Sequence, residues 1–169
     1  MNEQKTGKSK LDKGIFRAVK KDGTVYYRAS LTYRGKHISL GSYRDAGQAH
    51  SAYEEGIRLL NDSSLSLKSY RETSSLSFEK WVCLLNFRDN GIYLGNPIYM
   101  GQQLFYYYLT PHHVLKFDLE DLFYYSSHKI MRRGNHYFVS DYGMQLTLTS
   151  RYGIKSYAVP GRDYCFRNG

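Results

Sequence analysis

Cysteine, proline and tryptophan are scarce in this sequence, which has two, three and one of them among its 169 residues. The two cysteines, Cys83 and Cys165, provide neither a disulfide framework nor a paired metal-binding motif. Reduced thiols are typical of the cytosol, so we expect a cytoplasmic protein. No apolar run approaches the roughly 18 residues of a membrane-spanning helix, and the polar N-terminus does not resemble a secretory signal. These absences argue against disulfide-stabilised, zinc-ribbon and membrane-spanning classes.

Tyrosine and positive charge are abundant instead. The chain contains 18 tyrosines, and its 24 Lys and Arg residues outnumber 15 Asp and Glu residues, which gives a formal net charge of +9. Tyrosine combines a large contact area with a polar tip, and positive charge favours an anionic partner, nucleic acid before an acidic protein surface. Lysines at positions 5, 8, 10 and 13 predict a flexible basic arm over residues 1–13.

The next third of the chain has the pattern of a small antiparallel sheet. Asp22-Gly23 is a strong hairpin signal between two apolar runs, and Arg34-Gly35-Lys36 predicts a second turn. The run between these turns alternates apolar and polar residues with the two-residue period of a half-buried strand. The predicted strands cover residues 15–19, 25–33 and 37–43.

One amphipathic helix is expected after these strands. Apolar residues recur at helical spacing over residues 46–60, Asp45 stands at the N-cap position, and Asn61-Asp62 ends the pattern. The sequence therefore predicts an α+β protein whose first module, residues 14–62, is a three-stranded antiparallel sheet with one helix.

Basic side chains recur along the predicted strands and turns of this module. The candidate nucleic-acid-binding residues are Arg17, Lys20, Lys21, Arg28, Arg34, Lys36 and Arg44. Cations clustered on a small sheet are typical of surfaces that contact phosphates, and we expect Arg17, Arg28, Arg34 and Lys36 to share one face. The solvated face of an ordinary soluble sheet remains the alternative interpretation.

Four segments of the module carry a resemblance to a known family. They are Tyr27-Arg28-Ala29, Gly35-Lys36, Leu40-Gly41-Ser42-Tyr43 and Ala49-His50-Ser51-Ala52-Tyr53. The pattern resembles the ethylene-response-factor (Apetala-type) DNA-binding domain, in which a three-stranded sheet lies in the major groove. This resemblance implies DNA binding through the sheet. Tyr27 stands where that family often has tryptophan, and the first strand is short.

The rest of the chain predicts a linker and a second module. Residues 63–76 are rich in serine and are interpreted as the linker, and residues 77–169 as a mixed module of helices and strands. Within that module we expect helices over 78–87 and from Thr110-Pro111 to Phe123, a strand over 136–140, an ambiguous segment at 144–152 and a hairpin over 157–166.

Ionisable residues of the second module are candidates for catalysis. They are His112, His113, Asp118, Glu120, Asp121, His128, His136, Asp141 and Asp163, and none of them forms a pair at a diagnostic spacing. Asp118, Glu120, His128 and His136 are the first candidates for an acid, a base or a metal ligand. No visible motif requires a cofactor, and a divalent metal ion would be needed only if the protein were a nuclease.

A second resemblance covers roughly the last sixty residues. The segments Ser126-Ser127-His128-Lys129-Ile130-Met131-Arg132-Arg133-Gly134-Asn135-His136 and Arg151-Tyr152-Gly153-Ile154-Lys155 are its clearest parts. They are similar to a module of phage and mobile-element proteins of low-GC Gram-positive bacteria. Several such proteins are anti-CRISPR inhibitors of type II RNA-guided nucleases, and some relatives carry His-Asn-His nuclease features. Because the chain ends after a strand-like run, we expect native residues beyond Gly169.

Three functions therefore remain open. The first is inhibition of a type II CRISPR effector in the cytoplasm of a bacterial host, by binding guide RNA, DNA or the ribonucleoprotein, with or without guide cleavage. The second is a DNA-binding module of a phage regulator, and the third is a nuclease related to the His-Asn-His endonucleases.

Overall fold

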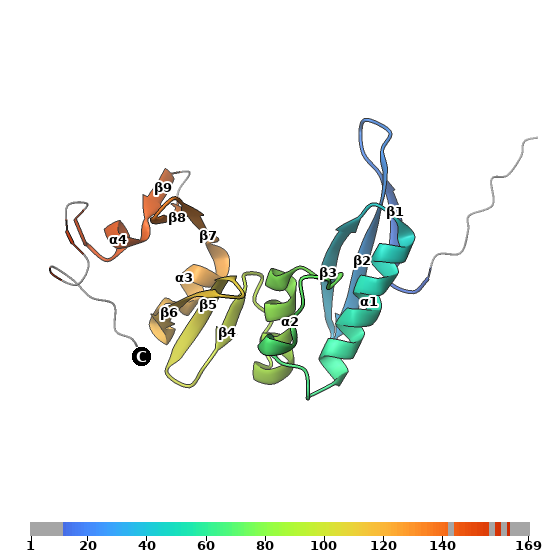
Figure 1. Ribbon diagram of the computed structural model, residues 1–169, viewed down its shortest axis with the longest axis horizontal. Coiled ribbons are helices and arrows are strands. Elements are labelled where there is room, and N and C mark those ends of the chain that lie inside the picture. The colour runs from blue at the N-terminus through green and yellow to red at the C-terminus, as the bar shows by residue number, and fades with distance from the viewer. Residues whose placement is uncertain (1–11, 142–143, 156–157, 160–161, 163–169) are drawn as a thin grey trace, which may run out of the picture. The chain divides into compact units, whose positions relative to one another are not determined.

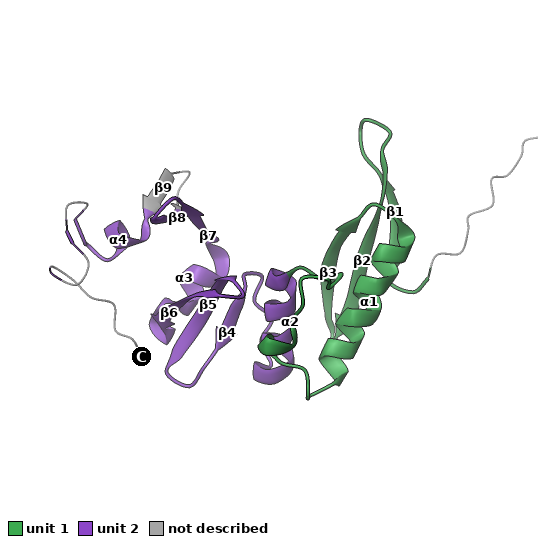
Figure 2. Cartoon of the chain, in the orientation of Figure 1, with its two compact units in different colours: residues 1–77 green, residues 78–169 purple. Residues whose placement is uncertain are grey.

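The computed structural model describes residues 12–141, 144–155, 158–159 and 162 (Figure 1). The chain divides into two compact units, residues 1–77 and residues 78–169 (Figure 2). Both units mix helices with antiparallel sheets, so the α+β prediction is confirmed.

The first unit consists of a three-stranded antiparallel sheet and one long helix. Its elements are β1 (Ile15–Val19), β2 (Val25–Tyr33), β3 (Lys36–Tyr43) and α1 (Ala46–Asn61), with strand order β1-β2-β3. Helix α1 packs against all three strands. Asp45 is its N-cap and accepts a 2.8 Å hydrogen bond from the backbone N–H of Gln48, as the sequence predicts.

Close packing of α1 on the sheet depends on Gly56. A Cβ atom at Gly56 would lie 3.0 Å from Cδ2 of Leu31 and 3.3 Å from Cδ1 of Leu40, so the helix lies nearer to the sheet there than a larger residue would allow. The core beneath the helix is apolar and almost free of solvent contact. It contains Ile15, Ala29, Leu31, Ile38, Leu40, Ala49, Ala52, Leu59 and Leu60.

A bulge in β3 decides which of its side chains face α1. Ala29 pairs with Gly41 and Ser30 pairs with Ser39, so Leu40 lies between two paired positions without a partner of its own. Gly41 has φ of 144°, a conformation that favours glycine. Because an extra residue reverses the alternation of a strand, Leu40 faces the helix and Ser42 faces away from it.

The serine-rich segment after α1 belongs to the first unit. It contains the 3₁₀ helix η1 (Leu67–Ser69), and the unit extends to Ser77. The carboxylate of Glu55 accepts the backbone N–H groups of Ser75 and Leu76 at 2.9 and 3.1 Å. Residues 63–76, interpreted from the sequence as a linker, are thus tied back to α1.

The described part of the second unit contains one main helix and two small sheets. Its elements are α2 (Phe78–Asn90), β4 (Ile98–Met100), β5 (Leu104–Thr110), β6 (His113–Asp118), the 3₁₀ helix η2 (Leu119–Asp121), α3 (Leu122–Ser127), β7 (Ile130–Arg133), β8 (His136–Asp141), β9 (Met144–Thr147) and α4 (Leu148–Arg151). The sheets have strand orders β4-β5-β6 and β7-β8-β9, and both are antiparallel. One apolar core joins them, and Phe105, Tyr107, Tyr125 and Val139 are fully buried in it.

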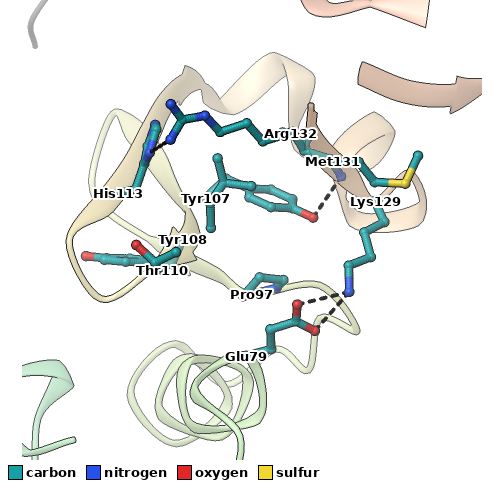
Figure 3. A pocket seen from close by; sticks show the side chains of 11 residues that line it. Glu79, Pro97, Tyr107, Tyr108, Thr110, His113, Lys129, Met131 and Arg132 are labelled. Carbon is teal, nitrogen blue, oxygen red and sulfur yellow. Dashed lines mark hydrogen bonds and ion pairs between the residues drawn. The ribbon is translucent and has the colours of Figure 1, made fainter. Parts of the chain in front are cut away.

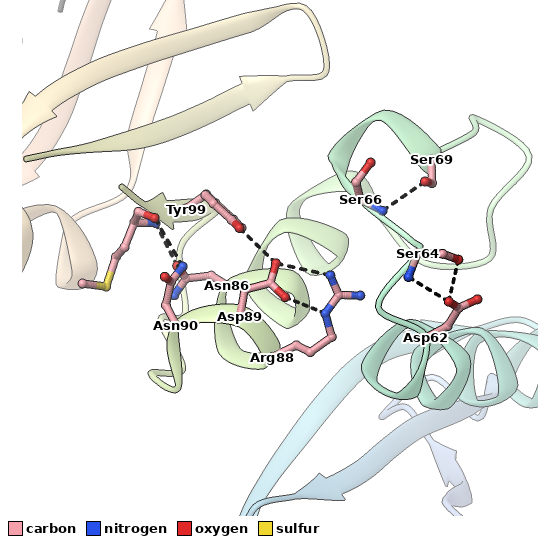
Figure 4. Close-up of polar contacts among 10 residues, drawn as sticks. Asp62, Ser64, Ser66, Ser69, Asn86, Arg88, Asp89, Asn90 and Tyr99 are labelled. Atoms are coloured by element: carbon pink, nitrogen blue, oxygen red, sulfur yellow. Dashed lines mark hydrogen bonds and ion pairs between the residues drawn. The ribbon is translucent and has the colours of Figure 1, made fainter. Parts of the chain in front are cut away.

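The side chain of Asn86 links α2 by hydrogen bonds to the segment that follows it (Figure 4). This side chain is fully buried, and its Oδ1 accepts the backbone N–H of Met100 at 2.8 Å and Nδ2 of Asn90 at 2.9 Å. Its Nδ2 donates to the carbonyl of Ile92 at 2.9 Å. All of its polar atoms therefore have partners, as a buried amide requires.

The helix predicted from Thr110-Pro111 to Phe123 is wrong over its first half. Thr110 pairs with His113 across a tight turn, and β6 follows with exposure that alternates along the strand. Proline after threonine is common both in a first helical turn and at the second position of a β-turn, so the signal did not separate them. Phe123 does lie in a helix, the short α3.

Two other expectations for the second unit agree with the structure. The helix at 78–87 and the strand at 136–140 are confirmed. The ambiguous segment at 144–152 contains both a strand, β9, and a helix, α4. Most of the hairpin expected over 157–166 and most of the basic arm over 1–13 lie outside the described residues.

Candidate nucleic-acid interface

The face of the first unit's sheet that is turned away from α1 is the candidate interface, here called the outer face. It is made of Phe16, Ala18, Tyr26, Arg28, Ser30, Thr32, His37, Ser39 and Ser42, as strand pairing and alternation require. Phe16, Arg28 and Ser42 form one row across the three strands. Phe16 lies on the edge strand β1, at one end of this row, and its ring is 53% exposed.

Arg28 is held in place on the outer face by its neighbour. Its Nη2 donates a 3.1 Å hydrogen bond to the hydroxyl of Tyr26, and its guanidinium carbon lies 5.7 Å from the centre of that ring. An exposed arginine that is already oriented loses less side-chain freedom when it binds a planar or tetrahedral anion.

The four cations predicted to share a face do not do so. Arg17 pairs with Tyr27, which places it on the α1 side, and Lys36 pairs with Tyr33 on that same side. Arg34 lies in the turn between β2 and β3, with φ of 46° and its guanidinium 5.0 Å from the ring of Tyr33. Only Arg28 of the four belongs to the outer face, because alternation fixes one side of the sheet for each strand residue.

The remaining candidate cations lie at the ends of the strands. Lys20 and Lys21 lie in the β1–β2 turn, and Arg44 directly follows β3. The two turns are at opposite ends of β2, whose nine residues span roughly 27 Å. Cations at both turns and at the centre therefore extend over most of one helical turn of duplex DNA, which is roughly 34 Å.

Charge is segregated between the sheet and the helix. Residues 13–44 contain eight Lys and Arg residues and one acidic residue, Asp22, whereas α1 contains Glu54, Glu55 and a single cation, Arg58. The positive field of the first unit thus originates from the sheet and its turns.

The four candidate catalytic residues of the second unit do not converge. His128 precedes β7, and His136 pairs with Arg133 at the far end of the β7–β8 hairpin, so the length of β7, roughly 10 Å, separates them. Asp118 ends β6 opposite Leu104, and Glu120 is an exposed residue of η2. Across the described ranges, no three His, Cys, Asp or Glu side chains are placed to hold a metal ion.

His128 is instead packed as part of a stack. Its ring lies nearly parallel to that of Tyr124, with the centroids 4.1 Å apart, and its Nδ1 is 2.7 Å from the carbonyl oxygen of Tyr124. The guanidinium carbon of Arg151 lies 3.3 Å from the centre of the same tyrosine ring. These contacts fix the imidazole to α3 and give it a structural role.

A pocket in the second unit brings His113, one of the ionisable candidates, together with residues that were not candidates, among them Glu79, Lys129 and Arg132 (Figure 3). His113 contacts both Arg132 and the hydroxyl of Tyr137, and Lys129 forms an ion pair with Glu79. The sequence pattern did not predict this group because it placed His113 in a helix over 110–123. A helix there gives no basis for expecting His113 beside β7. Lys129 and Arg132 belong to a segment that carries the second resemblance. That segment was the sequence signal from which this group could have been predicted.

Neither a protein-family model, nor a curated protein, nor a solved structure matches the chain. No helix within the described ranges has the length and apolar character needed to cross a membrane.

Proposed function

We propose that the protein binds duplex nucleic acid through the outer face of the first unit, mainly by contacts with phosphates. The observation that carries the proposal is the segregation of eight cations and one acid onto the sheet and its turns, around a row in which Phe16 and Arg28 are exposed. Phosphate contacts supply most of the affinity of non-specific nucleic-acid binding.

In this proposal, different side chains have different tasks. Lys20 and Lys21 at one turn and Arg34 at the other are placed to contact the two ends of a backbone segment, and Arg28 contacts its middle. Phe16 beside Arg28 supplies an apolar contact to the bases or sugars. Arg17 and Lys36, on the α1 side of the sheet, and Arg44, after β3, add to the field over a longer range.

Binding of the whole protein to a fluorescent DNA duplex, followed by anisotropy, tests the proposal. We expect Arg28→Gln to weaken binding by about ten-fold, the loss of one charge-assisted contact. Arg58→Gln is the matched control because it removes the same charge from the exposed surface of α1. Equal effects of the two variants would mean that the sheet is only a solvated surface.

Inhibition of a type II CRISPR effector in a bacterial cytoplasm is a more specific form of the same proposal. Its support is the second resemblance together with a cationic surface that would compete for guide RNA or target DNA. The test is target cleavage by the effector with and without the protein, followed by electrophoresis of the guide under denaturing conditions. Undiminished cleavage at a large excess of the protein would exclude inhibition.

A further inference from the structure

The pocket of the second unit has a volume of about 260 Å³ and a lining drawn from several elements (Figure 3). Glu79 comes from the first turn of α2, Pro97 from the residues before β4, and Thr110 and His113 from the β5–β6 turn region. Strand β5 adds residues 107–109, and the edge strand β7 with the residue before it supplies the remaining wall, residues 129–132. The pocket therefore lies wholly within one folded unit.

Arg132 and His113 hold each other in position at this pocket. Nη1 of Arg132 is 3.3 Å from Nδ1 of His113, and its Nε donates to the carbonyl of Gly134 at 2.9 Å. A guanidinium only donates, so Nδ1 accepts, and the neutral imidazole carries its proton on Nε2, toward the hydroxyl of Tyr137. Two of the guanidinium's N–H groups are thus engaged, and the others remain to donate to a ligand.

The edge of β7 adds backbone donors to the same wall. The N–H of Ile130 donates to the hydroxyl of Tyr107 at 3.0 Å, so it points away from β8. Residues two apart on an antiparallel strand direct their N–H groups to the same side, which places the N–H of Arg132 on this edge too. Burial raises the pKa of Tyr107 to about 12, so its hydroxyl keeps its proton and is also a donor.

Lys129 is a further cation within reach of the pocket. Its Nζ lies 2.9 and 3.0 Å from the two carboxylate oxygens of Glu79. Both side chains are more than half exposed, at 56% and 52%, so water and salt weaken this ion pair. An anion with two negative charges competes for such a lysine more effectively than a carboxylate does.

We propose that this pocket binds a phosphate monoester, either that of a free nucleotide or that of a phosphorylated strand end. Arg132 and the β7 edge supply several donors to one part of the pocket, which suits a tetrahedral oxyanion, and Lys129, whose ammonium group points toward Glu79 elsewhere in the lining, adds positive charge (Figure 3). Pro97, Met131 and the ring of Tyr108 provide an apolar wall for the attached sugar or base. The volume of about 260 Å³ is slightly below the usual range of small-molecule pockets, so the pocket suits a small ligand.

Calorimetric titration of the whole protein tests this site with three probes. Deoxyadenosine 5′-monophosphate is expected to bind saturably, inorganic phosphate more weakly, and deoxyadenosine at least about ten-fold more weakly than the nucleotide. A 5′-phosphorylated oligonucleotide, compared with its 5′-hydroxyl form, then separates the two sources. A preference for the phosphorylated end assigns the site to strand ends, and its absence assigns it to free nucleotides. Equal binding of nucleotide and nucleoside would overturn the proposal.

Neighbouring arginines of β7 provide a matched pair of variants. Arg132→Gln should weaken nucleotide binding by about ten-fold, whereas Arg133→Gln, an equal loss of charge at an exposed position outside the pocket, should change it less than about two-fold. Glu79→Gln should strengthen binding because it releases Lys129. Equal losses of nucleotide affinity in the two arginine variants would show a non-specific effect of charge and would contradict the proposal.

This site is independent of the interface proposed for the first unit, and the variants distinguish the failure of one proposal from the failure of the other. Arg28→Gln should leave nucleotide binding unchanged, so either proposal fails alone. Thermal unfolding of each variant identifies a loss of folding. If Arg132→Gln is unfolded, Lys129→Gln takes its place, and a folded Lys129→Gln protein that binds the nucleotide as tightly as the wild type would overturn the proposal.

Discussion

Two glycines of the first unit share a backbone conformation but differ in their surroundings, and they give a sharp test of its packing. Gly14 and Gly23 have φ of 79° and 85°, which L-residues rarely adopt. A Cβ atom at Gly14 would lie 2.4 Å from Cε2 of Tyr53 and 2.5 Å from the backbone oxygen of Ser30, whereas no atom lies within 4 Å of the corresponding position at Gly23. Alanine at Gly23 therefore adds only backbone strain.

The magnitudes follow from these distances. Gly23→Ala should cost about 1–2 kcal/mol, the ordinary penalty of a left-handed alanine. Gly14→Ala carries the same penalty plus about 1–3 kcal/mol for overpacking against a backbone atom that cannot move aside. The variants should thus differ by about 2 kcal/mol, or roughly thirty-fold in an opening equilibrium.

Hydrogen exchange of the β2 amides measures this difference in the whole protein. Protection should fall much further in Gly14→Ala than in Gly23→Ala, because Gly14 accepts the N–H of Ser30 at 2.9 Å at the start of the sheet. Equal losses of protection would show that the chain before β1 does not pack on Tyr53 as described.

Three further predictions concern single side chains. Burial raises the pKa of the Cys83 thiol to about 11, so the unfolded state loses this proton first as pH rises above about 8.5. Between about pH 9 and 10, below the range in which the tyrosines titrate, the free energy of unfolding should therefore fall by up to about 1.4 kcal/mol per pH unit, and denaturation of Cys83→Ala should show a smaller slope there. Asn86→Ala removes the hydrogen-bond partner of the partly buried N–H of Met100 and of the carbonyl of Ile92 and should cost about 1–3 kcal/mol in urea unfolding, and an unchanged free energy of unfolding would contradict the described network. Phe16→Ser should leave stability within about 0.5 kcal/mol, since the ring is half exposed, yet weaken duplex binding without changing its salt dependence. Unchanged affinity would remove Phe16 from the interface.

The fold of the first unit was predictable because each signal had one interpretation. Asp22-Gly23 marked a hairpin, Asp45 marked a helix start, and the alternation along β2 fixed the faces of that strand. The bulge at Leu40 was not predictable, because it arises from pairing with β2, and it alone brings Ser42 to the side of Arg28.

The interface was only partly accessible from the sequence. All seven candidate cations lie on the sheet, its turns or the residue after β3, but their faces depend on register, which composition does not reveal. In the second unit the threonine-proline signal favoured a helix over the β5–β6 hairpin, and the group around His113 was hidden as a result.

The salt dependence of duplex binding tests the central claim most directly. Contacts from Lys20, Lys21, Arg28 and Arg34 predict that the logarithm of the binding constant falls with the logarithm of salt concentration with a slope of about −4. Affinity should then decrease by about 10² between 50 and 200 mM salt. Arg28→Gln should reduce the slope to about −3, while Arg58→Gln should leave it unchanged. A slope near zero, or one that Arg28→Gln does not alter, would contradict phosphate binding by this sheet.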